Sequence, residues 1–419
     1  MRRSLKFFSD SPVSWLFCFF FCTGIFLPNG IKTLSLILFL LYLLPGLKLK
    51  EWWTGIRKDG FTLASCGFFL LTALSWFWSS NKTEYFSELQ SKLPLLLVPL
   101  VITMPNQRLR TTEKPFLQAL YFSGILISLA CLLHATFFGK NLPLSERLVY
   151  EELACFSGIQ PIYLSLYLIL SSFAWYRLHF STGFTKSGWH LLIPLFFYLM
   201  VVQLSSRTEL MVYTGAVFFV AIKHFRAHLI KVAAGFAVFT LLTALLISLD
   251  KTNLSRYSEM LDFKKDYRQN NWGGRSLRLE KWKNTLECYM QFPMLGTGAG
   301  DCSDELQKIY QKNGFDIAYT ARYNPHNQFL QSLLTLGPAG LLFLISMFGI
   351  AFFRARRQGD FSLFLLAYVF AASMITESML ERQTGVFLFS VLMAFFSAVP
   401  GEKVSSGNSG WYGTMQSKT

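Results

Sequence analysis

Apolar stretches recur along the chain, separated by short polar connections. Most are roughly 17–25 residues long, the length that a helix needs to cross a bilayer. Transmembrane β-strands would instead alternate apolar and polar residues over about ten positions. We therefore predict an all-α, polytopic membrane protein with about twelve transmembrane helices. The predicted spans are residues 12–27, 31–47, 61–79, 93–104, 116–138, 158–176, 191–205, 208–222, 232–249, 328–353, 361–376 and 384–399.

One long polar region, residues 250–323, interrupts this pattern between the ninth and tenth spans. A structureless loop of this length is uncommon, so we expect it to contain helices. An amphipathic helix at about 276–291 is predicted by residues that recur at helical spacing, namely Leu279, Trp282, Leu286 and Tyr289. A second short helix is predicted from near Ser303 to Gly314, because acidic residues favour its first turn and glycine favours its end.

The domain organisation follows from this pattern. We interpret residues 1–400 as one transmembrane helical domain, with residues 250–323 as a subdomain inserted over its outer face. Residues 401–419 are rich in serine and glycine, and we expect them to form a short, disordered cytoplasmic tail.

Composition and charge agree with a membrane protein. The chain is 52% hydrophobic and 15% charged, against about 25% charged residues in a typical soluble domain. The net charge of +15 would suit a nucleic-acid-binding protein, but its distribution follows topology. With the N-terminus in the cytoplasm, the cytoplasmic segments hold 20 of the 39 lysines and arginines, the short outer connections hold 7, and residues 250–323 hold the other 12. This asymmetry obeys the positive-inside rule, so we expect membrane lipids as partners and no nucleic acid.

A polar segment containing His326 leads directly into the tenth predicted span. Histidine exchanges protons near neutral pH, and ionisable groups at the edge of a bilayer are candidates for function. His326 is therefore a candidate catalytic residue, with a purely structural hydrogen-bonding role as the alternative. Arg322 and Asn327, which flank it, are candidate substrate-binding residues; Asn327 could instead cap the following helix or orient the ring.

Arginines on the same predicted outer side supply further candidates. Arg207 lies in the short turn before the eighth span, on the side where the positive-inside rule disfavours arginine. Arg275 and Arg278 are three residues apart on the predicted loop helix and share a face. Two guanidinium groups on one face can clamp a diphosphate. The alternatives are an arginine that reaches to lipid headgroups and a solvated basic helix face that includes Lys281.

Two further motifs invite an interpretation. The segment Gly296-Thr-Gly-Ala-Gly300 has the glycines of a phosphate loop, but it follows no strand, so we predict a tight turn that returns the loop helix to the membrane surface. Glu377 and Glu381 lie four residues apart at the outer end of the eleventh span. We expect them to form ion pairs, with substrate contact as the alternative.

The seven cysteines include no Cys-x-x-Cys pair and no cluster with histidine, which argues against a zinc site. Cys155, Cys288 and Cys302 are predicted on the outer side, where a disulfide would persist in an oxidising compartment.

Several candidates also form an ordered pattern. His326 and Asn327 are followed, after nine residues, by Gly337 and then by Gly340. Upstream lie the segments Ser206-Arg-Thr208, Arg278-Leu-Glu-Lys-Trp282 and Pro293-Met-Leu-Gly-Thr-Gly298. This order resembles the bacterial O-antigen ligase family, which shares a superfamily with O-antigen polymerases and some protein O-oligosaccharyltransferases. The likeness covers about residues 200–340, and the plan of twelve spans resembles membrane glycosyltransferases of the C type.

The resemblance implies an enzyme of the bacterial inner (plasma) membrane whose active site faces the periplasm. Such an enzyme transfers a glycan from undecaprenyl diphosphate to a hydroxyl of lipid A–core oligosaccharide, and neither a metal nor a cofactor is implied. Arg207 and Arg278 would stabilise the leaving diphosphate, with Arg275 as the alternate. His326 would accept the proton of the acceptor hydroxyl during an inverting displacement.

Other functions remain open from the sequence. The nearest is a polymerase for O-antigen or exopolysaccharide, which uses the same donor and a second lipid-linked glycan as acceptor. A protein O-oligosaccharyltransferase is less favoured, because residues 401–419 leave no room for a further domain. A secondary transporter would suit twelve spans, but its charges would gather near mid-membrane. A non-enzymatic envelope scaffold would tolerate substitution of Arg207 and His326.

Overall fold

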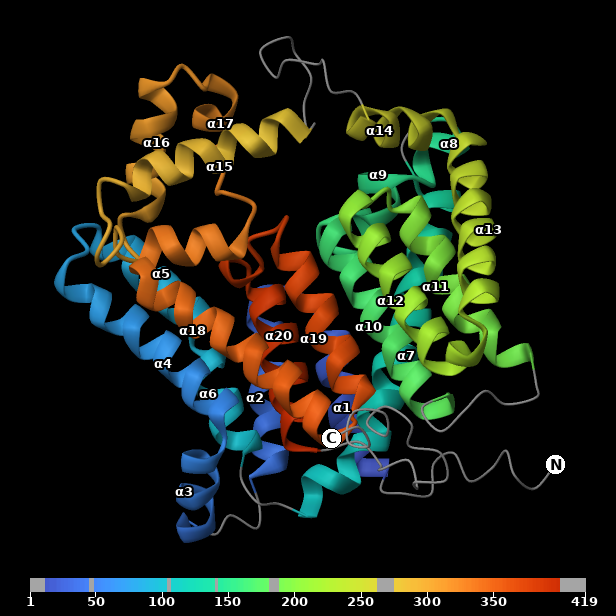
Figure 1. Cartoon of the computed structure of the whole chain (residues 1–419), viewed down its shortest axis with the longest axis horizontal. Coiled ribbons are helices and arrows are strands. Elements are labelled where there is room, and N and C mark those ends of the chain that lie inside the picture. Colours follow the sequence, from blue (N-terminus) through green and yellow to red (C-terminus); the bar gives the residue numbers. More distant parts are fainter. Residues whose placement is uncertain are drawn as a thin grey trace, which may run out of the picture.

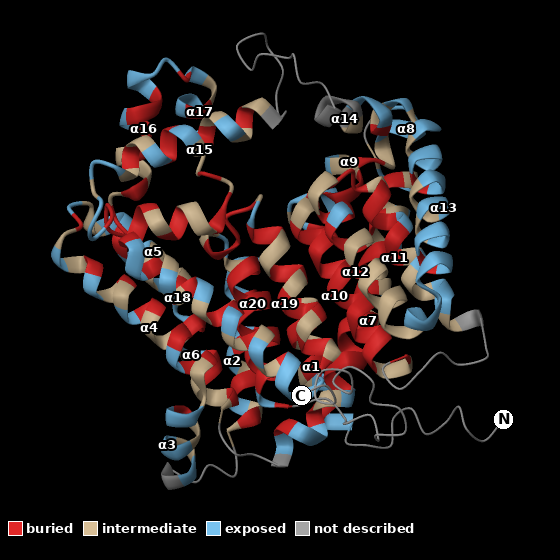
Figure 2. Ribbon diagram, in the orientation of Figure 1, coloured by how far each residue is buried: buried red, intermediate tan, exposed pale blue. Residues whose placement is uncertain are grey.

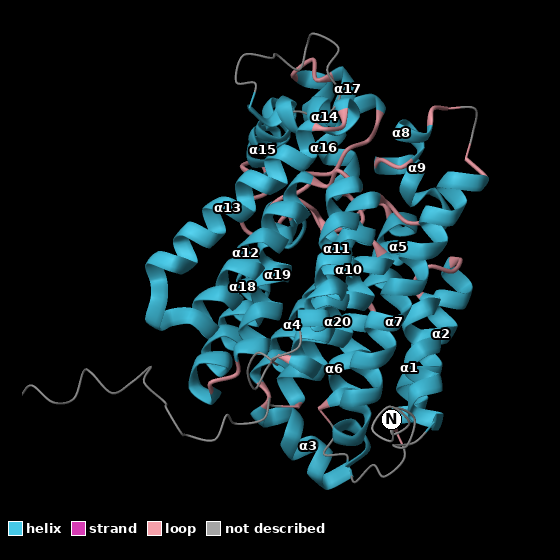
Figure 3. Ribbon diagram, turned by 90° about the vertical axis from the view of Figure 1, so that its right-hand side faces the viewer, coloured by secondary structure: helices cyan, strands magenta, loops and turns pink. Residues whose placement is uncertain are grey.

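The computed structural model describes residues 12–44, 49–103, 107–139, 142–180, 188–261 and 275–399. Within these ranges every regular element is a helix, as Figure 1 and Figure 3 show, which confirms the all-α class. The predicted tail 401–419 lies outside the described residues. Each predicted span coincides with a helix: α1 (Pro12–Gly24), α2 (Asn29–Leu43), α4 (Gly60–Leu74), α6 (Pro94–Ile102), α7 (Gln107–Phe137), α10 (Pro161–His179), α11 (Leu192–Gln203), α12 (Arg207–Phe225), α13 (Leu229–Ser248), α18 (Gln328–Gln358), α19 (Phe361–Met374) and α20 (Gln383–Ala398).

Not all of these helices could cross a bilayer by themselves. Among the described residues, four stretches are long and apolar enough, or five if the bent pair Tyr150–Ser157 and Pro161–His179 counts as one span. The four stretches are Gly60–Phe77, Arg108–Phe137, Arg207–Ser248 and Gln328–Gln358. The chain is thus a helical membrane protein, and the number of twelve spans stays a prediction.

The burial pattern fits a bundle surrounded by lipid. α10, α11, α19 and α20 carry a continuous apolar core, drawn red in Figure 2. By contrast, α13 buries only Val232 and Thr243, although its sequence is strongly apolar. This helix, with its exposed leucines, forms the pale blue edge of the molecule in Figure 2. Long apolar surfaces of this kind are stable only against hydrocarbon or another protein.

The remaining helices are shorter and more polar. α3 (Leu49–Lys58) lies at the lower end in Figure 1, whereas α14 (Lys251–Leu261), α15 (Arg275–Tyr289), α16 (Cys302–Lys312) and α17 (Asp316–Thr320) lie at the upper end. α5 (Lys82–Lys92), α8 (Leu144–Arg147) and α9 (Tyr150–Ala154) also lie toward that end, which we call the His326 end after the residue that it carries. The two helices predicted within 250–323 are confirmed as α15 and α16; α14 and α17 were not predicted.

The buried side of α15 differs from the hydrophobic pattern in its sequence. Leu279 and Leu286 are 49% and 45% exposed, whereas Lys281, Asn284 and Thr285 are buried. The reason is that α15 packs against both α16 and α18. Polar side chains on the buried side of α15 form hydrogen bonds at these interfaces. Asn284 Oδ1, for example, accepts a hydrogen bond from Asn313 Nδ2 at 2.8 Å.

A break in α18 anchors this upper subdomain to the bundle. Pro338 has no amide N–H, so the helix cannot supply a donor to the Leu334 carbonyl. The backbone amide of Thr297 donates to that carbonyl instead, at 2.8 Å. Gly337 has φ +66°, and a Cβ there would lie 2.5 Å from the Met294 carbonyl oxygen. The glycine-rich segment 296–300 is therefore the predicted turn, and its amides are used to dock it on α18.

Gly337 and Gly340 are three residues apart within a predicted span, a spacing that is typical of close helix approach in membranes. The structure corrects this in part: the close neighbour at Gly337 is the loop backbone at Met294, Leu295 and Gly296, not another helix. A positive φ favours glycine because it has no Cβ, and the close contact leaves no room for one. The same residue thus permits both the break in α18 and the docking of the loop.

Candidate active site

Charged side chains from four separate segments meet at the His326 end. Arg207 is the first residue of α12, Arg278 and Lys281 lie on α15, His326 immediately precedes α18, and Glu377 follows α19. We call these five residues the His326 cluster. Electrostatic interactions link Arg278 to Arg207 and Glu377, and link His326 to Lys281 and Arg278. The structure therefore brings together the two arginines and the histidine that the sequence singled out.

The backbone around His326 is held in an unusual conformation. His326 has φ +48°, a left-handed value that costs free energy in a residue with a Cβ and persists only where the surroundings impose it. Asn324 Oδ1 accepts a hydrogen bond from the His326 amide at 2.9 Å, and Trp282 Nε1 donates to the Pro325 carbonyl at 3.1 Å. The loop helix α15 therefore fixes the histidine segment through Trp282.

The His326 ring is oriented by a carboxylate. Its Nδ1 lies 3.1 Å from Glu377 Oε2, and a carboxylate accepts, so Nδ1 carries the proton and Nε2 keeps a free lone pair. The His326 side chain is 29% exposed, whereas that of Glu377 is 8% exposed. A substrate can therefore reach the ring of His326 but not the carboxylate behind it.

The charges of the cluster favour a neutral imidazole. Burial lowers the pKa of His326, and the positive charges of Lys281 and Arg278 lower it further, against the opposing effect of Glu377. Burial raises the pKa of Glu377, but its hydrogen bond to His326 and the nearby cations outweigh burial and hold it below the ordinary value. At neutral pH the pair is therefore a carboxylate and a neutral ring, the arrangement that a general base requires.

The cluster gathers three cations, Arg207, Arg278 and Lys281, close to one another. Arg278 Nη1 donates to Thr208 Oγ1 at 3.3 Å, which holds its guanidinium beside the start of α12. Burial lowers the pKa of Arg278, and Arg207 adds to this, although Glu377 and Glu209 oppose it. Burial and Arg278 also lower the pKa of Lys281, to about 7. Because the start of a helix also attracts anions, this arrangement is suited to a phosphate or diphosphate.

The other predicted substrate-binding residues, Arg275, Arg322 and Asn327, are not members of the His326 cluster. Arg275 begins α15, but its side chain lies outside the described part. Arg322 is exposed and forms an ion pair with Asp304 at 2.7 Å. Asn327 is buried and caps α18, since its Oδ1 accepts the Leu330 amide at 3.0 Å. Arg322 and Asn327 are thus engaged in other contacts, and a part in substrate binding stays a prediction for all three residues.

Two members of the cluster were not assigned to the site from the sequence. Lys281 was grouped with a solvated basic face, yet it is 4% exposed and its Nζ lies 4.6 Å from the ring centre of Tyr323. Its position three residues after Arg278, on the same helical face, was the available signal. Glu377 was expected to form an ion pair; it instead accepts a hydrogen bond from the neutral ring of His326. Glu381 does form an ion pair, with Lys92 at 3.1 Å.

Two of the cysteines predicted on the outer side lie in the upper subdomain. Cys288 and Cys302 are both buried free thiols, so the structure contains no disulfide between them. Burial raises the pKa of each thiol to about 12. No group of three or more potential metal-binding side chains occurs in the part of the chain that the structure describes.

The site thus combines an oriented base with a group of buried cations, a set that can remove a proton from a hydroxyl while it holds an anionic leaving group. Residues 191–345 match a protein-family model described as O-antigen ligase. The matched region runs from α11 into α18 and includes Arg207, Arg278, Lys281 and His326, but not Glu377. No curated protein matches the chain.

Proposed function

The chain belongs to the O-antigen ligase family over residues 191–345, and on this basis we propose that it is a membrane glycosyltransferase that uses a lipid-linked glycan. The donor that we propose is a glycan on undecaprenyl diphosphate, and the acceptor is a hydroxyl of lipid A–core oligosaccharide. The proposed location is the bacterial inner membrane, with the His326 end in the periplasm. The excess of lysine and arginine in the segments predicted at the opposite end supports this orientation.

One observation carries the proposal: an accessible, neutral histidine lies among three neighbouring cations, Arg207, Arg278 and Lys281. Nε2 of His326 is free because Nδ1 is bound to Glu377, and Arg278 is held at the start of α12, beside Arg207. A base alone would suit many reactions, and a cation cluster alone would suit simple anion binding. Their combination favours transfer from a diphosphate to a hydroxyl.

The proposed reaction is a single displacement at the anomeric carbon of the donor. The acceptor oxygen forms a bond to this carbon as the bond from the carbon to the diphosphate oxygen breaks. The proton of the acceptor hydroxyl passes to Nε2 of His326, and undecaprenyl diphosphate leaves with the electron pair of the broken bond. Because attack and departure occur on opposite faces, the product has inverted anomeric configuration.

Each residue of the cluster then has a distinct part. Arg207 and Arg278 stabilise the charge that develops on the leaving diphosphate, which fixed guanidiniums do well in a site with little water. Glu377 keeps the histidine in the correct tautomer and stabilises the imidazolium after proton transfer. Lys281 lowers the pKa of His326 and adds positive charge near the leaving group.

The proposal can be tested with the purified full-length protein in detergent or proteoliposomes, in the presence of EDTA. We expect glycan transfer from undecaprenyl diphosphate to added lipid A–core, with release of undecaprenyl diphosphate, because arginines and not a divalent metal hold the phosphates. No transfer to any acceptor would refute the enzyme, and a requirement for divalent metal would contradict the arginine clamp. Growth of longer lipid-linked glycan without added lipid A–core would identify a polymerase instead.

A further inference from the structure

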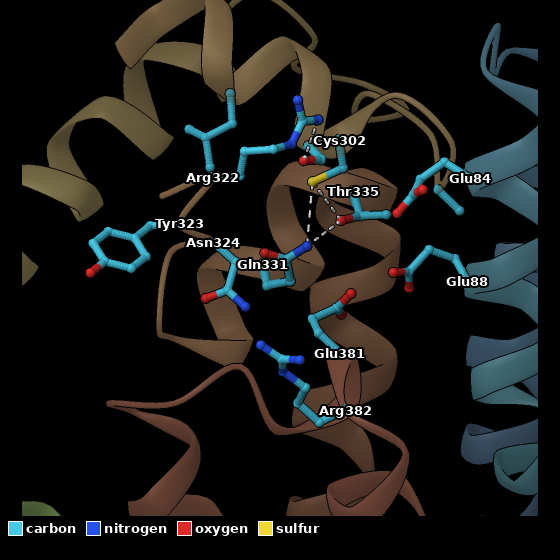
Figure 4. Close-up of a pocket in the computed structure, with 13 residues that line it drawn as sticks. Glu84, Glu88, Cys302, Arg322, Tyr323, Asn324, Gln331, Thr335, Glu381 and Arg382 are labelled. Atoms are coloured by element: carbon cyan, nitrogen blue, oxygen red, sulfur yellow. Dashed lines mark hydrogen bonds between the residues drawn. The ribbon is translucent and has the colours of Figure 1, made fainter. Parts of the chain in front are cut away.

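A second polar site lies directly beside the His326 cluster. It is a cavity of about 160 Å³, shown in Figure 4, whose walls come from α5, α16, α18 and the segment around Glu381. None of the five cluster residues lines it. The two sites share one wall, because Asn324 lines the cavity and its Oδ1 also accepts the hydrogen bond from the His326 amide.

A buried hydrogen-bond acceptor in this cavity has no protein partner. Gln331 is 6% exposed, and its Nε2 lies 3.3 Å from both Thr335 Oγ1 and Cys302 Sγ. Its Oε1 makes no hydrogen bond with any described residue, and in Figure 4 this oxygen points away from Thr335. A buried acceptor without a partner costs about 1–3 kcal/mol. A ligand that donates a hydrogen bond would recover that free energy.

Charged groups face the same space. The Arg382 guanidinium points toward Asn324 in Figure 4 and forms neither a hydrogen bond nor an ion pair with another described residue. Glu84 and Glu88 line the opposite wall. The cavity therefore offers both donors and acceptors to a ligand that enters it.

Three carboxylates and two guanidinium groups line the cavity, and Lys92 lies beside two of the carboxylates. Glu88 and Glu381 share a single lysine, Lys92, whose side chain is 3% exposed. Burial and the neighbouring Glu88 raise the pKa of Glu381 to about 7, despite the opposing effect of Lys92. An anionic ligand would increase this repulsion, and a hydrocarbon tail would leave the polar walls without partners. A neutral ligand with many hydroxyl groups adds no negative charge and provides hydrogen-bond partners for the polar walls.

We propose that this cavity binds the uncharged terminal sugar of the acceptor glycan, the ring that carries the attacking hydroxyl. Sugar hydroxyls donate to Gln331 Oε1 and to the carboxylates, and accept from Arg382. The space holds about five water molecules at roughly 30 Å³ each, which is comparable with one monosaccharide ring. This inference rests on the proposed glycosyl transfer and adds to it the place and the chemical class of the acceptor.

The position relative to His326 favours the acceptor over the donor. In a displacement with inversion, the attacking oxygen and the leaving diphosphate lie on opposite sides of the anomeric carbon. The arginines that would hold the diphosphate do not line the cavity, whereas Asn324, two residues before His326, does. His326 lies next to the cavity, since its ring centre is 5.7 Å from that of Tyr323, which lines the cavity, and it can take a proton from a sugar bound there.

The test is the steady-state kinetics of the full-length protein, with the concentrations of undecaprenyl-diphosphate glycan and lipid A–core varied separately. We expect Gln331→Leu to raise KM for lipid A–core about tenfold, the effect of one lost hydrogen bond to a buried group. KM for the donor should stay unchanged. Arg382→Ala should have the same effect, and because Arg382 is exposed, this variant keeps the test valid if Gln331→Leu does not fold.

Gln307→Leu is the matched control. Gln307 is 5% exposed, its amide also lacks partners among the described residues, and it lies on α16 of the same subdomain, but it does not line the cavity. This variant should keep the wild-type KM for lipid A–core. An unchanged acceptor KM in both cavity variants, or an increase in donor KM alone, would overturn the acceptor site. If the wild-type protein still transfers glycan, the proposed function stands in that case. A wild-type protein without transfer would instead refute the function itself.

Discussion

Two arginines at opposite ends of the bundle have very different surroundings. Arg177, near the end of α10, lies 2.6 Å from Glu113 and 3.4 Å from Asp360, so two carboxylates surround one cation. At the His326 end, Arg278 shares Glu377 with Lys281 and His326. Asp360 and Glu377 flank the two ends of the same helix, α19. One end of α19 thus places two carboxylates around one cation, and the other places Arg278 and Lys281 beside the carboxylate of Glu377.

This difference separates a structural site from a functional one. A buried cation surrounded by carboxylates has no need of a further ligand, and its removal leaves buried charges unpaired. Neighbouring cations repel one another, and a bound anion relieves that repulsion, which suits a site for a diphosphate. Each prediction below tests whether that distinction holds.

The largest effect is expected from loss of the base. His326→Ala should reduce kcat for glycan transfer by about a thousandfold, because a positioned general base contributes typically 10²–10⁴. Donor binding should change little, since the arginines remain. The measurement is transfer to lipid A–core together with a binding assay for undecaprenyl diphosphate. Transfer at the wild-type rate would remove His326 from the mechanism.

The second largest effect is expected from loss of Arg278, and it contrasts with the effect of losing Arg177. Arg278→Ala should lower kcat about a hundredfold or more while the melting temperature in detergent stays close to that of the wild type, since one charge stabiliser of the transition state is lost. Arg278→Lys should recover only part of the rate, because an ammonium group lacks the planar pair of donors.

Arg177→Ala is the control for this contrast. It should destabilise the protein by about 3–5 kcal/mol, the cost of leaving buried carboxylates unpaired, and should leave the turnover of the folded fraction near that of the wild type. The proposed division between a structural and a functional end would fail if the two variants had the same phenotype.

The smallest effect is a change in pH dependence. His326 acts in its neutral form, which is lost as the pH falls through its pKa, so activity declines on the acid side. Lys281 lowers this pKa and Glu377 raises it. Lys281→Met should therefore move the acid limb of kcat/KM to higher pH, and Glu377→Gln should move it to lower pH, with a reduced kcat because the tautomer is no longer fixed. Shifts in the same direction would contradict the proposed network.

Some features of the fold could be predicted from the sequence, and others could not. The positions of the twelve helices follow from apolar runs, because backbone groups in hydrocarbon must bond within their own segment. The end of α15 before Pro293 and the stop of α16 near Gly314 follow from local chemistry that needs no tertiary contact. The buried face of α15 was not predictable, since it depends on two neighbours that present polar partners.

The sequence by itself determined an all-helical membrane protein, the polarity of its charges and the three residues that carry the proposed chemistry. Only the tertiary structure decided that Glu377 orients the His326 ring, that Lys281 is buried among other cations, and that the break at Gly337 and Pro338 docks the loop. The physical reason is that helix formation depends on neighbours along the chain. Counter-charge, tautomer and burial depend instead on groups that are far apart along the chain; His326 and Glu377, for example, are separated by 51 residues.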